Sequence, residues 1–245
     1  MSLKIRENYS PNFDIKPRAR NNVRFLILHY TGMKKEKEAI KRLIEIQSEV
    51  SAHYFIKKNG EIIRMVPDLH KAWHAGISQW GKYKNLNKYS IGIEISNPGH
   101  EFGYVNFSKK QIKSLTKLAI KLIKKYNIKK NNILGHSDVS PDRKKDPGEK
   151  FPWRILHRNK IGVWHKINSK KLITLRGKSA SDREISLFIK RLMKFGYPLK
   201  GVLIKNKKKY SKLLIKAFQR RFRPELISGN VDKECLLILK SVAKD

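Results

Sequence analysis

The sequence predicts an α/β fold, with a mixed domain of strands and helices followed by a small three-helix domain. Short β-branched runs alternate with helical patterns as far as about residue 166, and this alternation is typical of a mixed α/β domain. The later part of the chain shows only helical patterns. We therefore predict an N-terminal extension at 1–21, a mixed domain at 22–166, a linker at 167–178 and a helical domain at 179–245.

Four segments of the mixed domain predict strands. VRFLILHY at 23–30 is an apolar run typical of a buried strand. AHYFIKK and EIIRMV lie on either side of Asn59-Gly60, a pair that favours a hairpin because both residues tolerate positive φ. SIGIEIS at 90–96 alternates, so its isoleucines should face one side of the sheet and Glu94 the other.

Helical spacing and capping motifs predict the other elements of this domain. A helix is expected over 34–50 from its apolar spacing. Ser108 and Gln111 form a capping box ahead of an apolar stripe that runs to Tyr126. A brief strand, NNILGH at 131–136, should follow that helix.

The helical domain has its own start and stop signals. Ser181 and Glu184 form a second capping box, and Gly196 should end the helix that follows. A second stripe ends at Pro224, and a third helix should begin near Asp232. No candidate catalytic cluster is visible in this part of the sequence.

Charge is the most unusual feature of the composition. The 245 residues include 56 Lys and Arg against 20 Asp and Glu, a formal net charge of +36. Such an excess implies an anionic partner, namely a nucleic acid, a membrane surface or an acidic polymer such as cell wall, unless it is a compositional bias spread over a solvated surface. Because there is no basic repeat interleaved with aromatics and no recognised nucleic-acid module, we expect no nucleic-acid partner.

The single cysteine and the absence of long apolar runs limit the chemistry further. Cys235 alone cannot form an intrachain disulfide or a zinc site built mainly on thiolates. No segment has the length of a membrane span, and the N-terminus has no apolar run typical of a signal peptide. A metal site in this chain would therefore use histidine and carboxylate ligands.

Two histidines and one aspartate are candidate metal ligands. A catalytic zinc site needs three protein ligands and an open position. His29 and His136 lie at the ends of predicted strands, where binding groups of α/β sheets collect. Asp146 lies in the following loop, GHSDVSPDRKKDPG, which Pro and Gly residues restrain. A lone histidine at a strand end is more often structural, but two with an aspartate favour a site.

Glu94 and Lys144 are candidates for proton transfer and charge stabilisation. A carboxylate within an isoleucine-rich strand either pairs with a buried cation or acts as a general base on water in a cleft. Lys144 lies two residues before Asp146, so an extended backbone would point both side chains the same way. Its ammonium could stabilise an oxyanion, or it could belong to a solvated run of charges.

Four segments within residues 22–155 carry a family resemblance. They are HYTG from His29, SAHYFIKKNGEIIRMVP at 51–67, KAWHAGISQWGKYKNLNKYSIGIEISN at 71–97 and GHSDVSPDRKKDPG at 135–148. In this order they resemble the type 2 family of zinc-dependent N-acetylmuramoyl-L-alanine amidases, most closely the branch that processes muropeptides with a 1,6-anhydro sugar. The resemblance implies a mixed sheet flanked by helices, as in peptidoglycan recognition proteins, with a zinc cleft on one side.

The resemblance also implies a role for each matching residue. His29, His136 and Asp146 match the ligands of a Zn²⁺ cofactor, Glu94 the catalytic acid/base and Lys144 the transition-state stabiliser. Segments that line the family's substrate groove contain Tyr54, Trp73, His74, Asn87 and Arg143, although Trp73 and His74 could equally organise their loop.

The C-terminal part resembles a small three-helix peptidoglycan-binding domain. The matching segments are IKRLMKFGYPLKG and LIKAFQRRFRPELISGNVD. NKKKYSKLL departs from the family pattern before the second helix, so the domain is expected either to bind peptidoglycan or to serve for docking and spacing.

The resemblance implies hydrolysis of the amide bond between N-acetylmuramic acid and the L-Ala of stem peptides, in cell-wall turnover and recycling. A non-catalytic peptidoglycan-recognition protein is the alternative. The expected partners are peptidoglycan and muropeptides, and the expected oligomeric state is a monomer. The lack of a signal peptide favours the cytoplasm, whereas a wall-binding domain would suit the periplasm or cell envelope.

Overall fold

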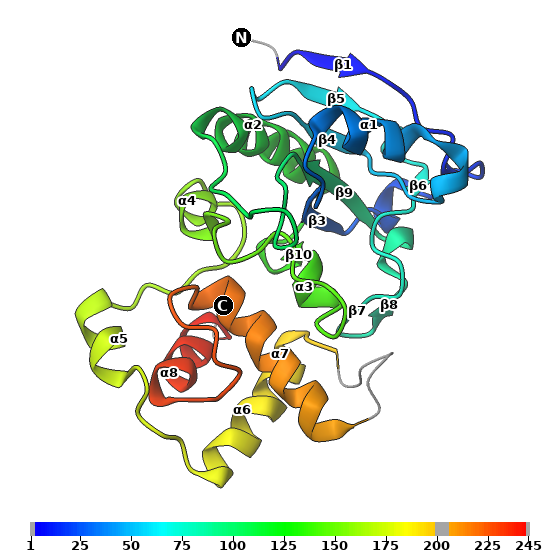
Figure 1. Cartoon of the computed structure of the whole chain (residues 1–245). Coiled ribbons are helices and arrows are strands. Elements are labelled where there is room, and N and C mark those ends of the chain that lie inside the picture. Colours follow the sequence, from blue (N-terminus) through cyan, green and yellow to red (C-terminus); the bar gives the residue numbers. More distant parts are fainter. Residues whose placement is uncertain (1–2, 199–205, 244–245) are drawn as a thin grey trace.

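The computed structural model describes residues 3–198 and 206–243 and is built around a six-stranded sheet (Figure 1). The strand order is β1-β5-β4-β9-β3-β10, and every neighbouring pair is parallel except the hairpin of β4 and β5. The strands are β1 (Ile5–Glu7), β3 (Phe25–Tyr30), β4 (Tyr54–Ile56), β5 (Ile62–Arg64), β9 (Ser90–Ile95) and β10 (Ile133–Gly135). Two smaller antiparallel pairs are β2 (Phe13–Asp14) with β6 (Lys71–Ala72), and β7 (Gln79–Trp80) with β8 (Tyr83–Lys84). The predicted fold class is confirmed.

Helices surround this sheet and form the C-terminal part of the described chain (Figure 1). They are α1 (Glu36–Ile44), α2 (Lys109–Tyr126), α3 (His136–Val139), α4 (Trp153–Arg158), α5 (Ser169–Leu175), α6 (Asp182–Phe195), α7 (Lys207–Phe222) and α8 (Lys233–Val242). Both predicted capping boxes are confirmed, at Ser108 with Gln111 before α2 and at Ser181 with Glu184 before α6. Among the described residues, the elements from α6 to α8 are all helices, as predicted for the C-terminal part.

The two faces of the sheet differ in character because side chains alternate along each strand. The predicted alternation of β9 is confirmed, and its three isoleucines are fully buried with the apolar residues of α2. On the opposite face, His29 of β3 lies in register beside Glu94 of β9, and Glu94 beside Phe55 of β4. Register partners on adjacent strands share a face, so His29 and Glu94 point to the same side.

The segment predicted as an N-terminal extension is part of the mixed domain. Its β1 pairs with β5 at the edge of the sheet, and β2 pairs with β6. Asn12, which is 1% exposed, donates from its side-chain amide to the carbonyls of Glu45 and Val50. The first of these bonds satisfies the carbonyl of Glu45, the C-cap of α1, and the helix ends at Ile44 rather than continuing through the predicted 34–50.

The C-terminal half contains the segment predicted as a linker and the helical domain that follows it. The segment predicted as a linker contains α5, which contacts α8. The helical domain packs on the mixed domain, and Trp80 of β7 and Tyr197 belong to one buried cluster with ring centroids 4.9 Å apart. The last residues of the IKRLMKFGYPLKG motif, 199–201, lie outside the described residues. Among the residues described, no helix is long and apolar enough to cross a membrane.

Candidate active site

A pocket of about 440 Å³ lies at the carboxyl ends of β3 and β9, on the polar face of the sheet. One wall is formed by α1 and another by the loop that contains Lys144 and Asp146. His29, Glu94 and His136 also line it. All five residues predicted as metal ligands or catalytic groups therefore meet in one pocket, although they come from separate parts of the chain.

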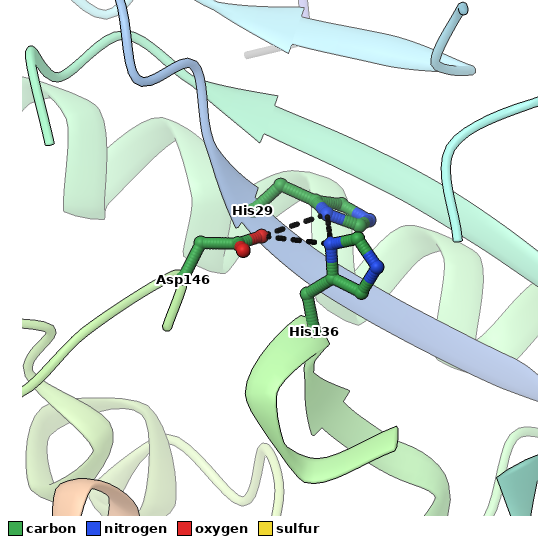
Figure 2. Close-up of side chains that lie close together, drawn as sticks. All are labelled: His29, His136 and Asp146. Carbon is green, nitrogen blue, oxygen red and sulfur yellow. Dashed lines mark hydrogen bonds and ion pairs between the residues drawn. The ribbon is translucent and has the colours of Figure 1, made fainter. Parts of the chain in front are cut away.

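His29, His136 and Asp146 converge on a single point (Figure 2). The Oδ2 atom of Asp146 lies 3.0 Å from His29 Nδ1 and 3.1 Å from His136 Nδ1, and the two Nδ1 atoms are 3.0 Å apart. All three side chains are buried. His29 is near the end of β3, His136 is the first residue of α3, and Asp146 belongs to the loop beyond α3.

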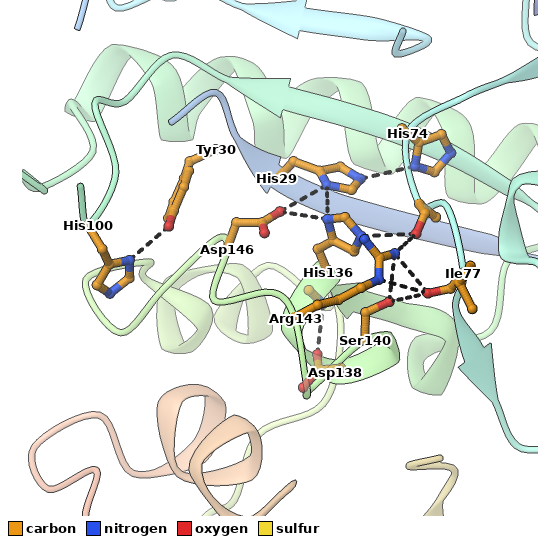
Figure 3. A network of polar contacts seen from close by, with 12 residues as sticks. His29, Tyr30, His74, Ile77, His100, His136, Asp138, Ser140, Arg143 and Asp146 are labelled. Atoms are coloured by element: carbon orange, nitrogen blue, oxygen red, sulfur yellow. Dashed lines mark hydrogen bonds and ion pairs between the residues drawn. The ribbon is translucent and has the colours of Figure 1, made fainter. Parts of the chain in front are cut away.

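A chain of hydrogen bonds fixes the orientation of His29 (Figure 3). The Ser90 hydroxyl donates to the Leu86 carbonyl at 2.7 Å, so its oxygen accepts from His74 Nε2 at 3.1 Å. His74 Nδ1 then has a lone pair, which accepts from His29 Nε2 at 3.0 Å. The remaining nitrogen of His29, Nδ1, therefore faces Asp146 with a lone pair.

His136 is oriented in the same way by a backbone carbonyl. Its Nε2 donates to the Ala75 carbonyl at 3.1 Å, which leaves Nδ1 as an acceptor facing Asp146. Arg143 donates to the same carbonyl and to the Ile77 carbonyl, and so holds the loop that orients His136 (Figure 3).

These orientations bring three acceptors together without a proton between them. Two imidazole lone pairs and a carboxylate oxygen repel one another unless a cation lies among them. Nitrogen and carboxylate ligands from two histidines and one aspartate match the donors of a catalytic zinc site, and partners that fix the other ring nitrogen are typical of metal-bound histidine. The donor set therefore fits a divalent metal ion.

Burial and charge keep this cluster in the form that binds a cation. Burial, together with the charge that His136 carries when it is protonated, lowers the pKa of His29 to about 4, so the His29 imidazole is neutral at pH 7. Burial alone would raise the pKa of Asp146, but at acidic pH the protonated forms of His136 and His29 beside it hold that pKa well below its usual range. Asp146 is therefore ionised while His29 is neutral.

Glu94 has the opposite electrostatic character. Burial, and then the negative charge of Asp146, raise its pKa well above the usual range, while the positive charge of Lys144 lowers it. The Oε2 atom of Glu94 is buried and has no hydrogen-bond partner among the described residues. Glu94 thus faces the pocket without a direct ion-pair partner in the described part of the chain, so the buried-pair alternative is not favoured.

Three of the five predicted substrate residues line this pocket, and two do not. Trp73, His74 and Arg143 contribute to its surface, with Trp73 Nε1 donating to Asp14 Oδ1 at 2.7 Å. Tyr54 lies on the opposite face of the sheet and donates to Asp68 at 2.6 Å. Tyr54 therefore does not line this pocket, because its register with Ile93 turns it towards α2.

Asn87 lies behind the pocket rather than in its wall. Its Oδ1 accepts from the backbone N–H groups of His74 and Ala75, and the residue lines a neighbouring cavity of about 790 Å³. Asn87 therefore holds the loop that orients both histidines.

Sequence reasoning missed other groups of the site. Ser90 completes the hydrogen-bond chain behind His74, and its place on the same face of the strand as Glu94 was the available signal. Tyr30 and His100 also line the pocket, and the Tyr30 hydroxyl lies 2.8 Å from His100 Nδ1 (Figure 3). No local signal distinguished His100, because its contact with Tyr30 joins two residues that are 70 positions apart in the sequence.

Comparison with known proteins agrees with this geometry. The profile of the N-acetylmuramoyl-L-alanine amidase family matches residues 19–149. The N-acetylmuramoyl-L-alanine amidase AmiD of Escherichia coli is 32% identical over 232 residues, which cover 90% of this chain and 82% of AmiD. The 1,6-anhydro-N-acetylmuramyl-L-alanine amidase AmpD of Haemophilus influenzae is 33% identical over 166 residues, which cover 60% of this chain and 88% of that protein.

A solved structure is similar over nearly the whole chain. It is a complex of the Escherichia coli AmiD with the substrate anhydro-N-acetylmuramic acid-L-Ala-D-γ-Glu-L-Lys. It superposes with a TM-score of 0.79 at 30% identity and covers 94% of this chain and 91% of AmiD. The family match, the identity to AmiD and the shared fold agree: this chain belongs to the N-acetylmuramoyl-L-alanine amidase family.

Proposed function

We propose that this protein is a zinc-dependent amidase of cell-wall turnover and recycling. It hydrolyses the amide bond between N-acetylmuramic acid, including its 1,6-anhydro form, and the L-Ala of peptidoglycan stem peptides. The observation that carries the proposal is the convergence of His29, His136 and Asp146 beside Glu94 in one pocket. The names of AmiD and AmpD, and the muropeptide bound to AmiD, support the choice of substrate.

The metal supplies one part of the chemistry. A zinc ion held by His29, His136 and Asp146 would act as a Lewis acid towards the amide and make the attacking water more acidic. Neutral His29 and ionised Asp146 suit this ligand set, because zinc binds the deprotonated form of each group.

Glu94 moves the proton. Its carboxylate accepts a proton from the attacking water and returns one to the leaving L-Ala amine. A raised pKa suits both steps, since a general acid/base works best when its pKa is close to the working pH. Lys144, on the same pocket wall as Asp146, stabilises the negative charge that forms on the amide oxygen.

The surface charge suits an acidic substrate. Stem peptides carry carboxylates, and a chain with a formal net charge of +36 attracts them at long range. This attraction should weaken as salt is added, because exposed charges are screened within about 10 Å at 0.1 M ionic strength.

The test is hydrolysis of a purified anhydro-muropeptide by the full chain loaded with zinc, with products identified by mass spectrometry. The wild-type protein should release the free stem peptide and bind one zinc ion. Glu94→Gln should keep the metal and lose roughly 10²–10⁴-fold in kcat, the range expected for removal of a general base.

Glu38→Gln is the matched control, since Glu38 is a carboxylate on α1 whose side chain is 50% exposed. It should hydrolyse the muropeptide at the wild-type rate. Wild-type protein that binds no metal and cuts no muropeptide would favour the non-catalytic alternative. Full turnover by Glu94→Gln would contradict the role of Glu94 alone.

A further inference from the structure

Asp138, two residues beyond His136, is held by the helical domain. Its carboxylate accepts from the Tyr197 hydroxyl at 2.6 Å and from Arg221 Nη1 at 2.5 Å. All three residues are at most 3% exposed. Tyr197 follows α6 and Arg221 belongs to α7, so both donors come from the helical domain.

Arg221 contacts both ends of the segment that contains His136. One guanidinium nitrogen pairs with Asp138 in α3, and the other donates to the Ile133 carbonyl in β10 at 2.9 Å. The guanidinium carbon also lies 4.2 Å from the centre of the Trp153 ring. Because its planar fork binds two partners in fixed directions, Arg221 fixes the distance between β10 and α3.

This segment is coupled directly to the metal-ligand cluster. Asp138 Oδ2 accepts from the Gly135 N–H at 2.8 Å, which closes the turn around His136 (Figure 3). The Ser137 N–H donates to the Asp146 carbonyl at 2.9 Å. A shift of α3 would therefore move His136 and the loop of Asp146 together.

We propose that the helical domain is a structural part of the metal site, with Arg221 and Tyr197 as positioning residues for His136. The proposal rests on the metal site of the proposed function and assigns the helical domain a role distinct from wall binding. Removal of either donor would leave the Asp138 carboxylate under-paired in a buried place, and α3 would relax towards water.

The test measures zinc affinity of the full chain by competition with a chelator. Arg221→Met keeps most of the side-chain volume but removes both hydrogen bonds, and it should weaken zinc binding roughly tenfold, the lower end of the range for residues behind metal ligands. Tyr197→Phe, which removes one hydroxyl, should weaken binding by a smaller factor. Arg221→Lys can pair with Asp138 but cannot contact Ile133 as well, so its affinity should be intermediate.

Arg176→Met is the matched control. Arg176 donates to Glu234 at 2.8 Å through two nitrogens, but this pair joins the end of α5 to α8 of the helical domain. The control should lower the stability of that domain and leave zinc affinity unchanged. In the metal-free Tyr197→Phe protein, the exchange of the Ser137 amide with solvent should also speed up more than that of amides in the central strands, whereas a uniform loss of stability would speed them up together.

Wild-type zinc affinity in both folded variants, Arg221→Met and Tyr197→Phe, would overturn the proposal. If Arg221→Met does not fold, unchanged affinity and unchanged Ser137 exchange in Tyr197→Phe overturn it equally. A wild-type chain without zinc affinity would instead contradict the proposed function, so the two failures are distinguishable.

Discussion

The two faces of the central sheet perform different tasks, although the same strands build both. On one face, apolar side chains of β3 and β9, such as Leu26 and Ile93, are fully buried with residues of α2. On the other face, the same strands present His29 and Glu94 to a pocket. The packed face fixes the strands in place. The polar face can therefore hold groups that are unfavourable to bury, such as an unpartnered carboxylate oxygen.

The largest effect on stability is expected from the apolar face. Leu26→Ala should lower the free energy of unfolding by about 2–5 kcal/mol, because Leu26 is completely buried and its removal leaves a cavity. Zinc affinity and kcat per folded molecule should stay at wild-type values, since Leu26 points away from His29. Denaturant unfolding and chelator competition on the same preparation measure the two quantities. A large loss of zinc affinity would show that the faces are not independent.

The predictions that the structure confirms rest on local sequence patterns or on the motifs of the family resemblance. Alternation in SIGIEIS and the two capping boxes depend on neighbours within a few residues, so they could be predicted and are confirmed. The convergence of His29, His136 and Asp146 could be predicted because the motifs of the family resemblance contain all three.

Other features depend on pairings between distant segments, which local patterns do not contain. The face of Tyr54 is decided by its register with Ile93. The short β1 has only a few residues and one partly buried side, so its pattern resembles an extension. Asp138 and Arg221 are 83 residues apart, and neither has a local partner that predicts the other.

A smaller effect, on metal binding rather than stability, is expected from the polar face. A Cβ atom at Gly92 would overlap the His74 ring, which supports His29 through its hydrogen-bond chain. Gly92→Ala should therefore displace that ring and weaken zinc binding roughly 10–100-fold, as loss of a partner behind a metal-bound histidine does. Chelator competition measures the loss.

Leu26→Ala is the control for Gly92→Ala, because it changes stability without touching His74. The two variants should separate clearly, one losing stability and the other metal affinity. Wild-type zinc affinity in Gly92→Ala would contradict the supporting role of His74. His74 would then be interpreted as a substrate-groove residue, as the family resemblance implies.

The smallest expected effect concerns His53, which lies behind His74 on the same face. Its Nδ1 accepts from the Gly92 N–H at 3.0 Å, and its Nε2 donates to the His70 carbonyl at 3.0 Å. Burial, together with the charge of Arg18, lowers its pKa to about 3. In the unfolded chain the imidazole has its ordinary pKa near 6.5.

The sign of the pH dependence follows from these two pKa values. Between pH 6.5 and 3 the unfolded state binds a proton at His53 that the folded state does not, so the free energy of unfolding falls as the pH falls. One such group contributes a slope of at most about 1.4 kcal/mol per pH unit. In His53→Gln, an amide could keep both hydrogen bonds without titrating, and the metal-free protein should lose stability less steeply over this range. The difference in slope between the two proteins measures the effect of His53, and equal slopes would show that burial there does not hold the imidazole neutral.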